Sequence, residues 1–447
     1  MNDQVFMDLL QAREYKAVRS ILNVMNAVDI AALMEDLEER DLAMAFRLIP
    51  KDKAAEVFTN MDSDQQSALV EVFTEKELKD VLDEMFLDDT VDLLEDLPAN
   101  LVTRILENVS PEKRRTINQL LNYPEDSAGS VMTTEYVSLK KSNTVAEALR
   151  LIKKIGIRKE TIYTCYVLEN RKLLGIVEAK DLLTEDDDVK MEDIMETKDE
   201  IVSVNTHDDQ EEVARLFQKY DLLALPVVDK DGLMVGIITV DDAMDVMEEE
   251  VSEDIALMGG LRPADDTYLA TPVIRHVANR IPWLLILMLS ATVTGLILTY
   301  YEQAFEAIPV LVSFIPMIMD TSGNCGSQAS TLIIRGLALE EIHLSDVFRV
   351  MFKELRVSLL VGLILAIVNG IRVLIMNRDP VIAIVVGLAL LCSVVIAKFI
   401  GCMMPMLATR LKLDPALMAS PLITTIVDAC SITIFFSIAV AILGIAM

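Results

Sequence analysis

The sequence predicts a multidomain membrane protein in which a large acidic soluble part precedes a helical membrane domain. Three observations carry this prediction. The first 262 residues hold 58 acidic and 29 basic side chains, whereas the remainder holds 12 and 11. Long apolar runs begin near residue 281, and a repeat with a period of roughly 60 residues lies before them. We therefore expect an all-α superhelical N domain, an α/β repeat pair, a connecting helix and a five-helix transmembrane domain.

Residues 1–125 are expected to form the acidic helical N domain. Their apolar residues recur at helical spacing in short segments that prolines separate, so the helices must stack to bury enough surface. The clearest segments are Ala27–Leu37, Asp41–Leu48, Ala54–Met61, Gln65–Phe73, Thr90–Leu97 and Leu101–Val109. Asp88 and Asp92 are four residues apart and would share one helix face. They indicate either a solvated first turn, which favours acids through the helix dipole, or a face that meets a cation.

The internal repeat reads as strand, helix, strand, turn, strand, helix in each copy. Val131-Met132 with Val137-Ser138-Leu139 matches Ile194-Met195 with Val202-Ser203-Val204, and Gly175-Ile-Val matches Gly236-Ile-Ile. The pattern resembles a tandem cystathionine-β-synthase (CBS) module, with motifs at 126–188 and 189–246.

This resemblance implies a pseudo-twofold pair of a type that often binds adenine nucleotides. An adenine ring would enter a cleft around Tyr163, Val177, Leu225 and Pro226. The alternative is a cleft filled by side-chain packing alone.

Residues 247–275 are expected to form a connecting helix and a linker. A helical pattern runs through 241–258 with a dense acidic face, and Gly259-Gly260 and Pro263 end it. A plain connecting helix is the alternative, although its charge exceeds what a connection needs.

Residues 276–447 are expected to cross the membrane five times, because a spanning helix needs roughly 20 mostly apolar residues. The predicted spans are Val277–Tyr301, Pro309–Ile334, Phe352–Met376, Val381–Ala408 and Ala416–Ala446. The chain opens with an acidic segment that does not resemble a cleavable signal. Basic residues are denser in the loops on the side of the soluble part, which predicts a cytoplasmic N-terminus and an extracytoplasmic C-terminus.

Asp428 is the sole charged residue between Pro415 and Met447. A carboxylate inside the membrane is costly unless it faces a cavity, a partner or an ion, so it marks a candidate functional site. Thr424, Thr425 and Ser431 surround it in sequence, and such oxygen ligands suit a hard cation such as Mg²⁺ or Ca²⁺. The alternative is a protonated aspartate that fixes helix packing.

Other chemistry finds little support in the sequence. The five cysteines are scattered and odd in number, the three histidines are far apart, and no phosphate-binding loop with a Lys-Ser/Thr ending occurs. We therefore expect neither an enzyme nor an ATP-driven pump, and no nucleic-acid partner.

With these parts in order, the chain resembles the MgtE family of magnesium channels. The sharpest matches are Gly323-Asn-Cys-Gly-Ser-Gln328 and Pro421-Leu-Ile-Thr-Thr-Ile-Val-Asp428, and Ser322 departs from the glycine more usual in the family. The resemblance implies a homodimer in the cytoplasmic membrane, with one pore on its twofold axis where Asp428 of both copies faces a hydrated Mg²⁺. The implied pore lining is Asn324, Gln328, Gly323, Gly326, Thr424 and Thr425, with a glycine-broken second span. Close helix packing is the alternative role for the two glycines.

The resemblance also implies regulatory Mg²⁺ sites in the acidic part. They would fall on Asp88, Asp92, Asp209, Glu211, Asp221, Asp242, Glu250, Glu253, Asp254 and Asp414. The connecting helix would then act as a plug, because bound Mg²⁺ draws mutually repelling acids together and closes the pore. ATP is a further possible regulatory ligand of the CBS pair.

Three functions remain open from the sequence. The first is a Mg²⁺ channel for uptake that cytosolic Mg²⁺ closes. The second is an ion-coupled secondary transporter of another divalent cation, with Asp428 as a relay. The third is a membrane-anchored nucleotide sensor, against which Asp428 argues.

Overall fold

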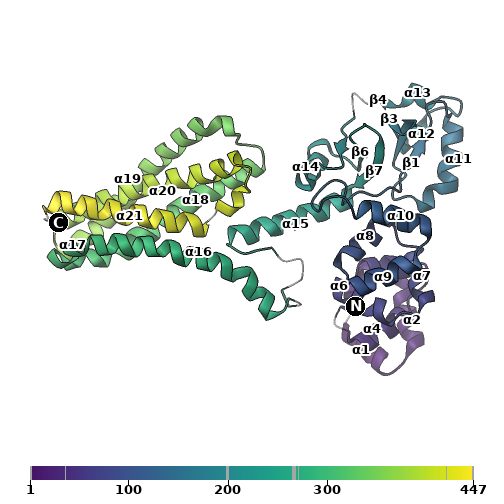
Figure 1. Cartoon of the computed structure of the whole chain (residues 1–447), viewed down its shortest axis with the longest axis horizontal. Helices are drawn as coiled ribbons and strands as arrows, with labels where there is room; N and C mark the ends of the chain where they lie inside the picture. The colour runs from purple at the N-terminus through teal and green to yellow at the C-terminus, as the bar shows by residue number, and fades with distance from the viewer. Residues whose placement is uncertain are drawn as a thin grey trace. The chain divides into compact units, whose positions relative to one another are not determined.

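A computed structural model describes residues 3–35, 37–197, 201–263, 268–269, 271–418 and 420–444. The chain forms two compact units, Met1–Glu248 and Glu249–Met447 (Figure 1).

Over its described residues, the first unit begins with ten short helices, as the amphipathic pattern predicted. They are α1 (Asp3–Gln11), α2 (Tyr15–Val24), α3 (Ala27–Met34), α4 (Glu39–Phe46), α5 (Ala54–Thr59), α6 (Ser63–Val72), α7 (Glu75–Leu82), α8 (Leu87–Asp96), α9 (Ala99–Asn108) and α10 (Pro111–Leu120). Side-chain caps set several starts: Asp62 accepts from the backbone N–H of Gln65, and Thr74 forms a capping box with Glu77. Caps and short lengths explain why the helices stack instead of merging.

The apolar core of this helical array continues into the second CBS motif. Phe46, Phe58 and Phe73 pack together with ring centroids 5.2–6.2 Å apart. The same buried cluster includes Leu225 and Ile238 from the second motif. The N domain and the second CBS motif are therefore held by one continuous core within the first unit.

The CBS repeat forms two small sheets with the predicted order of elements. The first motif contains β1 (Val137–Leu139), α11 (Val145–Ile155), β2 (Thr164–Glu169), β3 (Lys172–Glu178) and α12 (Ala179–Thr184), followed by α13 (Met191–Ile194) and β4 (Glu196–Thr197). The second contains β5 (Val204–Asn205), α14 (Gln210–Tyr220), β6 (Ala224–Val228) and β7 (Met234–Thr239). The strand orders are β1-β2-β3-β4 and β5-β6-β7, in which the first pair of each sheet is parallel.

The predicted helix over 241–258 is α15 (Val240–Met258). Thr239 precedes it, and the hydroxyl and backbone N–H of Thr239 both donate to the Asp242 carboxylate, at 2.5 and 3.4 Å. The last helix of the second CBS motif and the connecting helix are thus one continuous element.

Among the residues that the structure describes, the second unit contains five long helices at the positions of the predicted spans. They are α16 (Val273–Tyr300), α18 (Ile315–Ala338), α19 (Val347–Asn377), α20 (Pro380–Arg410) and α21 (Ser420–Leu443), with short α17 (Glu302–Ala307) and 3-10 turns at Pro309–Phe314, Leu344–Asp346 and Pro415–Met418 between them. Residues 419, 445 and 446 of the last predicted span lie outside the described residues.

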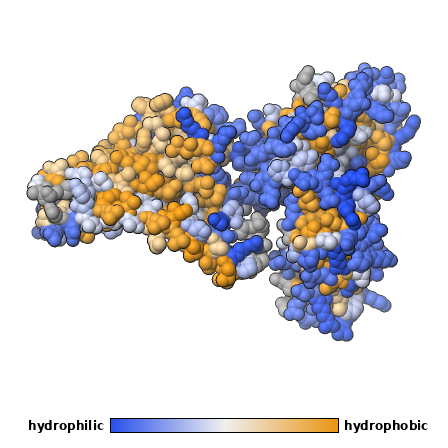
Figure 2. Space-filling model, in the orientation of Figure 1, coloured by the Kyte–Doolittle hydropathy of each residue, from blue (hydrophilic) through white to orange (hydrophobic). Residues whose placement is uncertain are grey.

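Four of these helical segments, counted over the described residues, are long and apolar enough to cross a membrane: Val273–Tyr300, Leu344–Asn377, Pro380–Arg410 and Pro415–Leu443. The exception is α18, whose 24 residues extend about 36 Å but include Asp320, Ser322, Asn324 and Gln328. The segment that carries the predicted pore lining is therefore the most polar of the five. Apolar residues cover most of the visible face of this unit, whereas polar residues cover most of the visible face of the first (Figure 2).

The predicted break in the second span does not occur, since α18 is helical from Ile315 to Ala338. Gly326 serves close helix packing, which was the alternative role for the two glycines. A Cβ on Gly326 would lie 3.0 Å from the Ile423 side chain and 3.2 Å from the carbonyl oxygen of Ala397. Small residues let neighbouring membrane helices approach without interrupting either helix.

Candidate functional site

Asp428 lies on α21 and faces α18 across a cavity of about 450 Å³. The cavity is lined by Ile315, Pro316, Met319, Asp320, Gly323, Asn324, Thr424 and Asp428. A Cβ on Gly323 would lie 3.2 Å from Thr424 and 3.8 Å from Oδ1 of Asp428, so the missing side chain leaves the carboxylate room against α18. Two carboxylates, one amide and one hydroxyl thus share one cavity, an all-oxygen donor set that suits a hard cation.

The predicted pore residues divide between this cavity and the helix contacts beside it. Gly323, Asn324 and Thr424 line the cavity with Asp428, whereas Gly326 is buried against α20 and α21. The hydroxyls of Thr424 and Thr425 both donate to the carbonyl oxygen of Pro421, at 3.0 and 2.9 Å. Gln328 is exposed one turn beyond Asn324 on the same face of α18.

Ser322 and Ser431 form a contact between α18 and α21 that the sequence did not reveal. The Ser431 hydroxyl donates to the Ser322 hydroxyl at 2.8 Å, and Ser322 donates in turn to the carbonyl oxygen of Ile318. The departure from glycine at residue 322 therefore adds a buried interhelical hydrogen bond. Ser431 uses its hydroxyl in this hydrogen bond and does not line the cavity.

A second group of acids lies within the first unit, around the start of α8. Asp88 is 9% exposed, so it is not part of a solvated first turn, while Asp92 one turn later is exposed. The Glu135 carboxylate accepts from the backbone N–H of Leu87 at 3.1 Å, and the backbone N–H of Glu160 donates to the carbonyl oxygen of Glu135 at 2.9 Å. Loops of the first CBS motif thus bring Glu135 and Glu160 to the acids of α8.

These residues belong to an acidic cluster that comprises Asp88, Asp89, Asp92, Glu135, Glu160, Asp241 and Asp242. Within it, burial and the repulsion of neighbouring acids raise the pKa values of Asp88, Glu160 and Asp242. Burial first, and then Asp242 and Asp89, raise the pKa of Asp88 to about 8. Burial, followed by Asp88, raises that of Glu160 to about 9, and burial raises that of Asp242 to about 6. Glu160 and Glu135 were missed from the sequence, since nothing near them marks a site.

The acidic cluster does not form a closed coordination shell. Over the described part of the chain, no three His, Cys, Asp or Glu side chains converge closely enough to hold a metal ion directly. Mg²⁺ keeps several of its waters when bound, so wider spacing between carboxylates still fits a hydrated ion.

The other predicted regulatory acids have local structural roles. Asp209 caps α14 by accepting from the N–H groups of Glu211 and Glu212, Glu211 pairs with Arg215, and Asp221 ends the helix in a left-handed conformation with φ 52°. Asp221 is about 18 Å along the helix from Asp209, so one chain does not bring them together.

The remaining predicted acids belong to the second unit. Glu250, Glu253 and Asp254 share one face of α15, and each of them takes part in a polar or electrostatic interaction. The Asp414 carboxylate accepts from the N–H of Ala416 at 2.7 Å and caps the turn before α21.

The four residues predicted to hold adenine differ in accessibility. Val177 and Leu225 are 1% and 0% exposed and belong to two separate apolar cores, and Pro226 is buried in β6. Tyr163 is 67% exposed immediately before β2. Of the four, Tyr163 is therefore the side chain that a ligand can reach.

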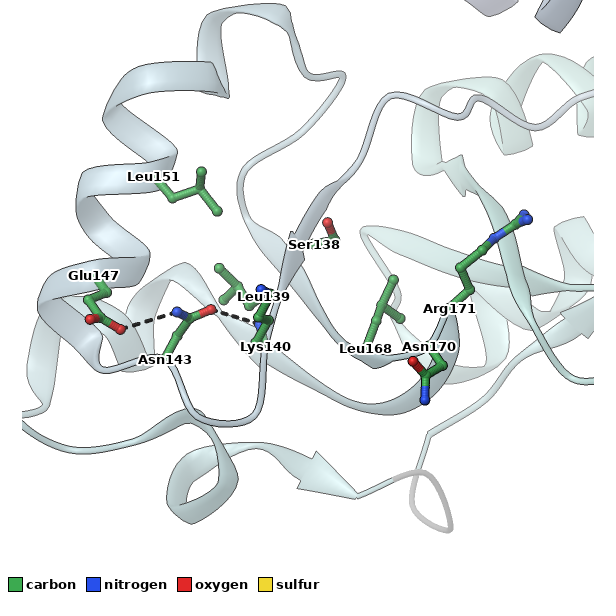
Figure 3. Close-up of a pocket in the computed structure, with 9 residues that line it drawn as sticks. All are labelled: Ser138, Leu139, Lys140, Asn143, Glu147, Leu151, Leu168, Asn170 and Arg171. Carbon is green, nitrogen blue, oxygen red and sulfur yellow. Dashed lines mark hydrogen bonds between the residues drawn. The ribbon is translucent and has the colours of Figure 1, made fainter.

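A cavity of about 460 Å³ lies elsewhere in the first CBS motif, between the end of β1, α11 and the β2–β3 turn (Figure 3). Asn143 accepts from the N–H of Lys140, and Glu147 accepts from Asn143 and from the N–H of Thr144. These bonds close the turn and cap α11, so the polar lining of the cavity already has a structural use.

Comparison with known families assigns the chain to a class of protein. The model of the MgtE intracellular N domain matches residues 2–126, the CBS domain matches 128–188 and 191–249, and a divalent cation transporter model, MgtE, matches 315–438. The fold and the cavity thus belong to a membrane transporter of divalent cations.

Full-length relatives define the family more closely. The magnesium transporter MgtE of Thermus thermophilus is 37% identical over 97% of this chain and 96% of its own length, and that of Bacillus subtilis is 30% identical over 97% and 95%. The chain belongs to the MgtE family of magnesium transporters.

Two solved structures of magnesium transporter proteins resemble about half of this chain. The cytosolic domain of the Mg²⁺ channel MgtE in complex with ATP is 36% identical, with a TM-score of 0.52, and the match covers 55% of this chain and 99% of that one. The soluble part of a magnesium transporter is 31% identical, with a TM-score of 0.51, over 56% and 97%.

Proposed function

We propose that the chain forms a Mg²⁺-selective channel for magnesium uptake across the cytoplasmic membrane, and that cytosolic Mg²⁺ closes it. The observation that carries this proposal is the cavity where Asp428 of α21 and Asp320 of α18 meet Asn324 and Thr424. A hydrated divalent cation gains attraction from two carboxylates while keeping most of its waters. A 36% identical relative that is a Mg²⁺ channel supports conduction over ion-coupled transport.

The proposed assembly is a homodimer with the N-terminus in the cytoplasm and the C-terminus outside. Asn324 and Gln328 are exposed on one face of α18 in a single chain. A second copy across a twofold axis would enclose this face and bring a second Asp428 to the same path. The loop charges support this orientation through the preference of basic residues for the cytoplasmic side.

Purified protein in liposomes loaded with a Mg²⁺-sensitive dye tests the transport step. We expect Asp428→Asn to lower Mg²⁺ influx at least a hundredfold with the same amount of folded protein, because the variant keeps the shape but not the charge that attracts the ion. Asp379→Asn is the matched control, because Asp379 caps α20 outside the cavity and asparagine also caps. Undiminished influx through the Asp428 variant would refute the proposed site.

The closing mechanism uses the acids of the first unit together with the connecting helix. At low Mg²⁺ the buried carboxylates repel one another, and bound hydrated Mg²⁺ offsets this repulsion, so high cytosolic Mg²⁺ favours the closed state. The raised pKa values of Asp88, Asp242 and Glu160 support a site that lacks its counter-charge when no cation is bound.

ATP is the second ligand that we propose, bound to the CBS pair as a regulator. A relative's cytosolic domain in complex with ATP supports it, and Tyr163 offers an exposed ring on which adenine can stack. Calorimetry should detect ATP binding to the wild-type chain and about tenfold weaker binding to Tyr163→Ala, whereas Tyr220→Ala, another exposed tyrosine, should bind normally. No heat with the wild type would remove ATP from the account.

A further inference from the structure

The second unit contains a buried ion pair outside the Asp428 cavity. Nζ of Lys398 on α20 lies 3.4 Å from Oε2 of Glu354 on α19, and the two side chains are 7% and 14% exposed. Charged groups are rare inside membrane helices and are retained where they serve a path or fix a partner. A buried pair also gives little net stability compared with apolar residues, so stability alone does not account for it.

The pair lies on the close seam between α19 and α20. A Cβ on Gly362 would lie 2.8 Å from the Leu391 side chain, and one on Gly387 would lie 3.5 Å from the carbonyl oxygen of Ala366. Residues of rising number on α19 thus meet residues of falling number on α20, as in any antiparallel helix pair. The same antiparallel pairing places Glu354 opposite Lys398.

On its other side, α20 holds α18 at the same height. The carbonyl oxygen of Ala397 would be 3.2 Å from a Cβ on Gly326, and a Cβ on Gly401 would collide with the carbonyl oxygen of Gly326. These two contacts bracket Lys398 in the sequence of α20. Because backbone meets backbone there, a shift of α20 moves α18 with little slack from side chains. Gly326 is three residues from Gly323, which lies against Asp428.

We propose that the Glu354–Lys398 pair is a positioning element of the cation path. It fixes α20 against α19 at the height where α20 holds α18, and so sets the spacing of Asp320 and Asn324 from Asp428 across the cavity. Glu354 and Lys398 act through the helices and do not contact the ion. The inference rests on the proposed function for its effect on transport, but the spacing of α18 and α21 can be measured without transport.

The transport test compares Lys398→Met, Glu354→Gln and the exchanged pair Glu354→Lys with Lys398→Glu. We expect each single change to lower Mg²⁺ influx per folded molecule at least tenfold and to change the ratio of Mg²⁺ to Ca²⁺ influx at least threefold. The exchanged pair should restore both to within about threefold, since an ion pair again joins the helices. Arg349→Met is the control, because Arg349 is 87% exposed and 3.9 Å from Asp346.

A distance measurement separates this inference from the proposed function. Spin labels at Thr331→Cys on α18 and Thr433→Cys on α21, both exposed positions, report the helix spacing once Cys392 and Cys430 are replaced by serine. We expect the label distance to change by at least 2 Å in Lys398→Met and to return in the exchanged pair. If wild-type protein carries no Mg²⁺, the proposed function fails while the label distances still decide this inference.

Two results would overturn the positioning role. One is that both single variants keep the wild-type label distance and the wild-type influx per folded molecule. The ion pair would then affect folding only. The other is an exchanged pair that folds but restores neither distance nor selectivity. If Lys398→Met fails to fold, Glu354→Gln and the exchanged pair give the same decision.

Discussion

The two acidic regions of this molecule place carboxylate side chains in different surroundings. In the membrane unit, Asp320 and Asp428 line one cavity of about 450 Å³ with an amide and a hydroxyl. In the first unit, Asp88, Asp242 and Glu160 repel one another while half or more buried, yet they form no direct coordination shell. In the proposed function, the cavity of the second unit holds a passing ion, whereas the carboxylates of the acidic cluster repel one another until a cation binds.

This difference suits the two roles that the proposed function gives to Mg²⁺, as transported ion and as inhibitor. A path needs ligands that hold the ion loosely enough to release it, which suits a few oxygens around a hydrated ion. A sensor needs a change in free energy between two states, which suits carboxylates whose repulsion depends on occupancy. The experiments below test whether the two roles can be separated.

Apart from the loss of influx expected in Asp428→Asn, the largest expected effect is on inhibition by cytosolic Mg²⁺. Asp88→Asn combined with Asp242→Asn removes two carboxyl groups that could bind a cation in the acidic cluster, so the Mg²⁺ concentration for half-inhibition should rise at least tenfold. Influx at low Mg²⁺ should stay within twofold of wild type, because the cavity is untouched. Asp64→Asn, an exposed acid at the start of α6, is the control. Equal inhibition of both variants would contradict the division of roles.

The second effect concerns pH. Because the folded pKa values of Asp88 and Glu160 exceed their ordinary values, the folded state binds more protons than the unfolded state between about pH 4 and 9. The free energy of unfolding should therefore fall as pH rises through this window in the absence of Mg²⁺. Thermal unfolding at pH 5.5 and 8.5 should show a larger stabilisation by Mg²⁺ at 8.5.

The control for the pH experiment is Glu160→Gln, which should flatten the pH slope and shrink the Mg²⁺ effect at pH 8.5. A Mg²⁺ stabilisation that is independent of pH in the wild type would mean that these carboxylates do not bind the ion.

The smallest effect is expected between α18 and α21. Ser322→Gly removes the hydrogen bond from Ser431 and should lower the free energy of unfolding by about 1 kcal/mol. The unfolding temperature of the second unit should fall by about 2–4 °C. Mg²⁺ influx should change little, because Ser322 does not line the cavity. Ser313→Gly, before α18, is the control, and a loss of influx in Ser322→Gly alone would assign Ser322 to the path.

Much of the fold could be predicted because its signals are local. Helical spacing gave the N-domain helices, the repeat gave the CBS pair, and apolar runs gave the long membrane helices. Asp428 was found because a lone charge in an apolar segment needs a reason. The break expected in α18 was wrong, since glycine in a membrane helix permits close packing as readily as it interrupts the helix.

What the sequence could not reveal depends on contacts between distant segments. Asp88 raises the pKa of Glu160 although the two residues are far apart in sequence. Ser431 donates a hydrogen bond to Ser322, and Lys398 forms an ion pair with Glu354. Lys398 was visible as an interruption of an apolar run, but its partner was not. Accessibility was also hidden: Val177 and Leu225 resemble cleft residues in sequence, and the structure buries both in apolar cores.

Patch recording from reconstituted wild-type protein tests the central claim most directly. With no proton gradient and Mg²⁺ as the main cation, we expect discrete channel openings. The open probability of the channel should fall as the Mg²⁺ concentration rises on the cytoplasmic side proposed for the first unit. Asp428→Asn should abolish the currents. The channel with Asp88→Asn and Asp242→Asn should stay open at Mg²⁺ concentrations that close the wild-type channel. Mg²⁺ movement that stops when the proton gradient is removed, with no unitary currents, would contradict the channel and favour an ion-coupled transporter.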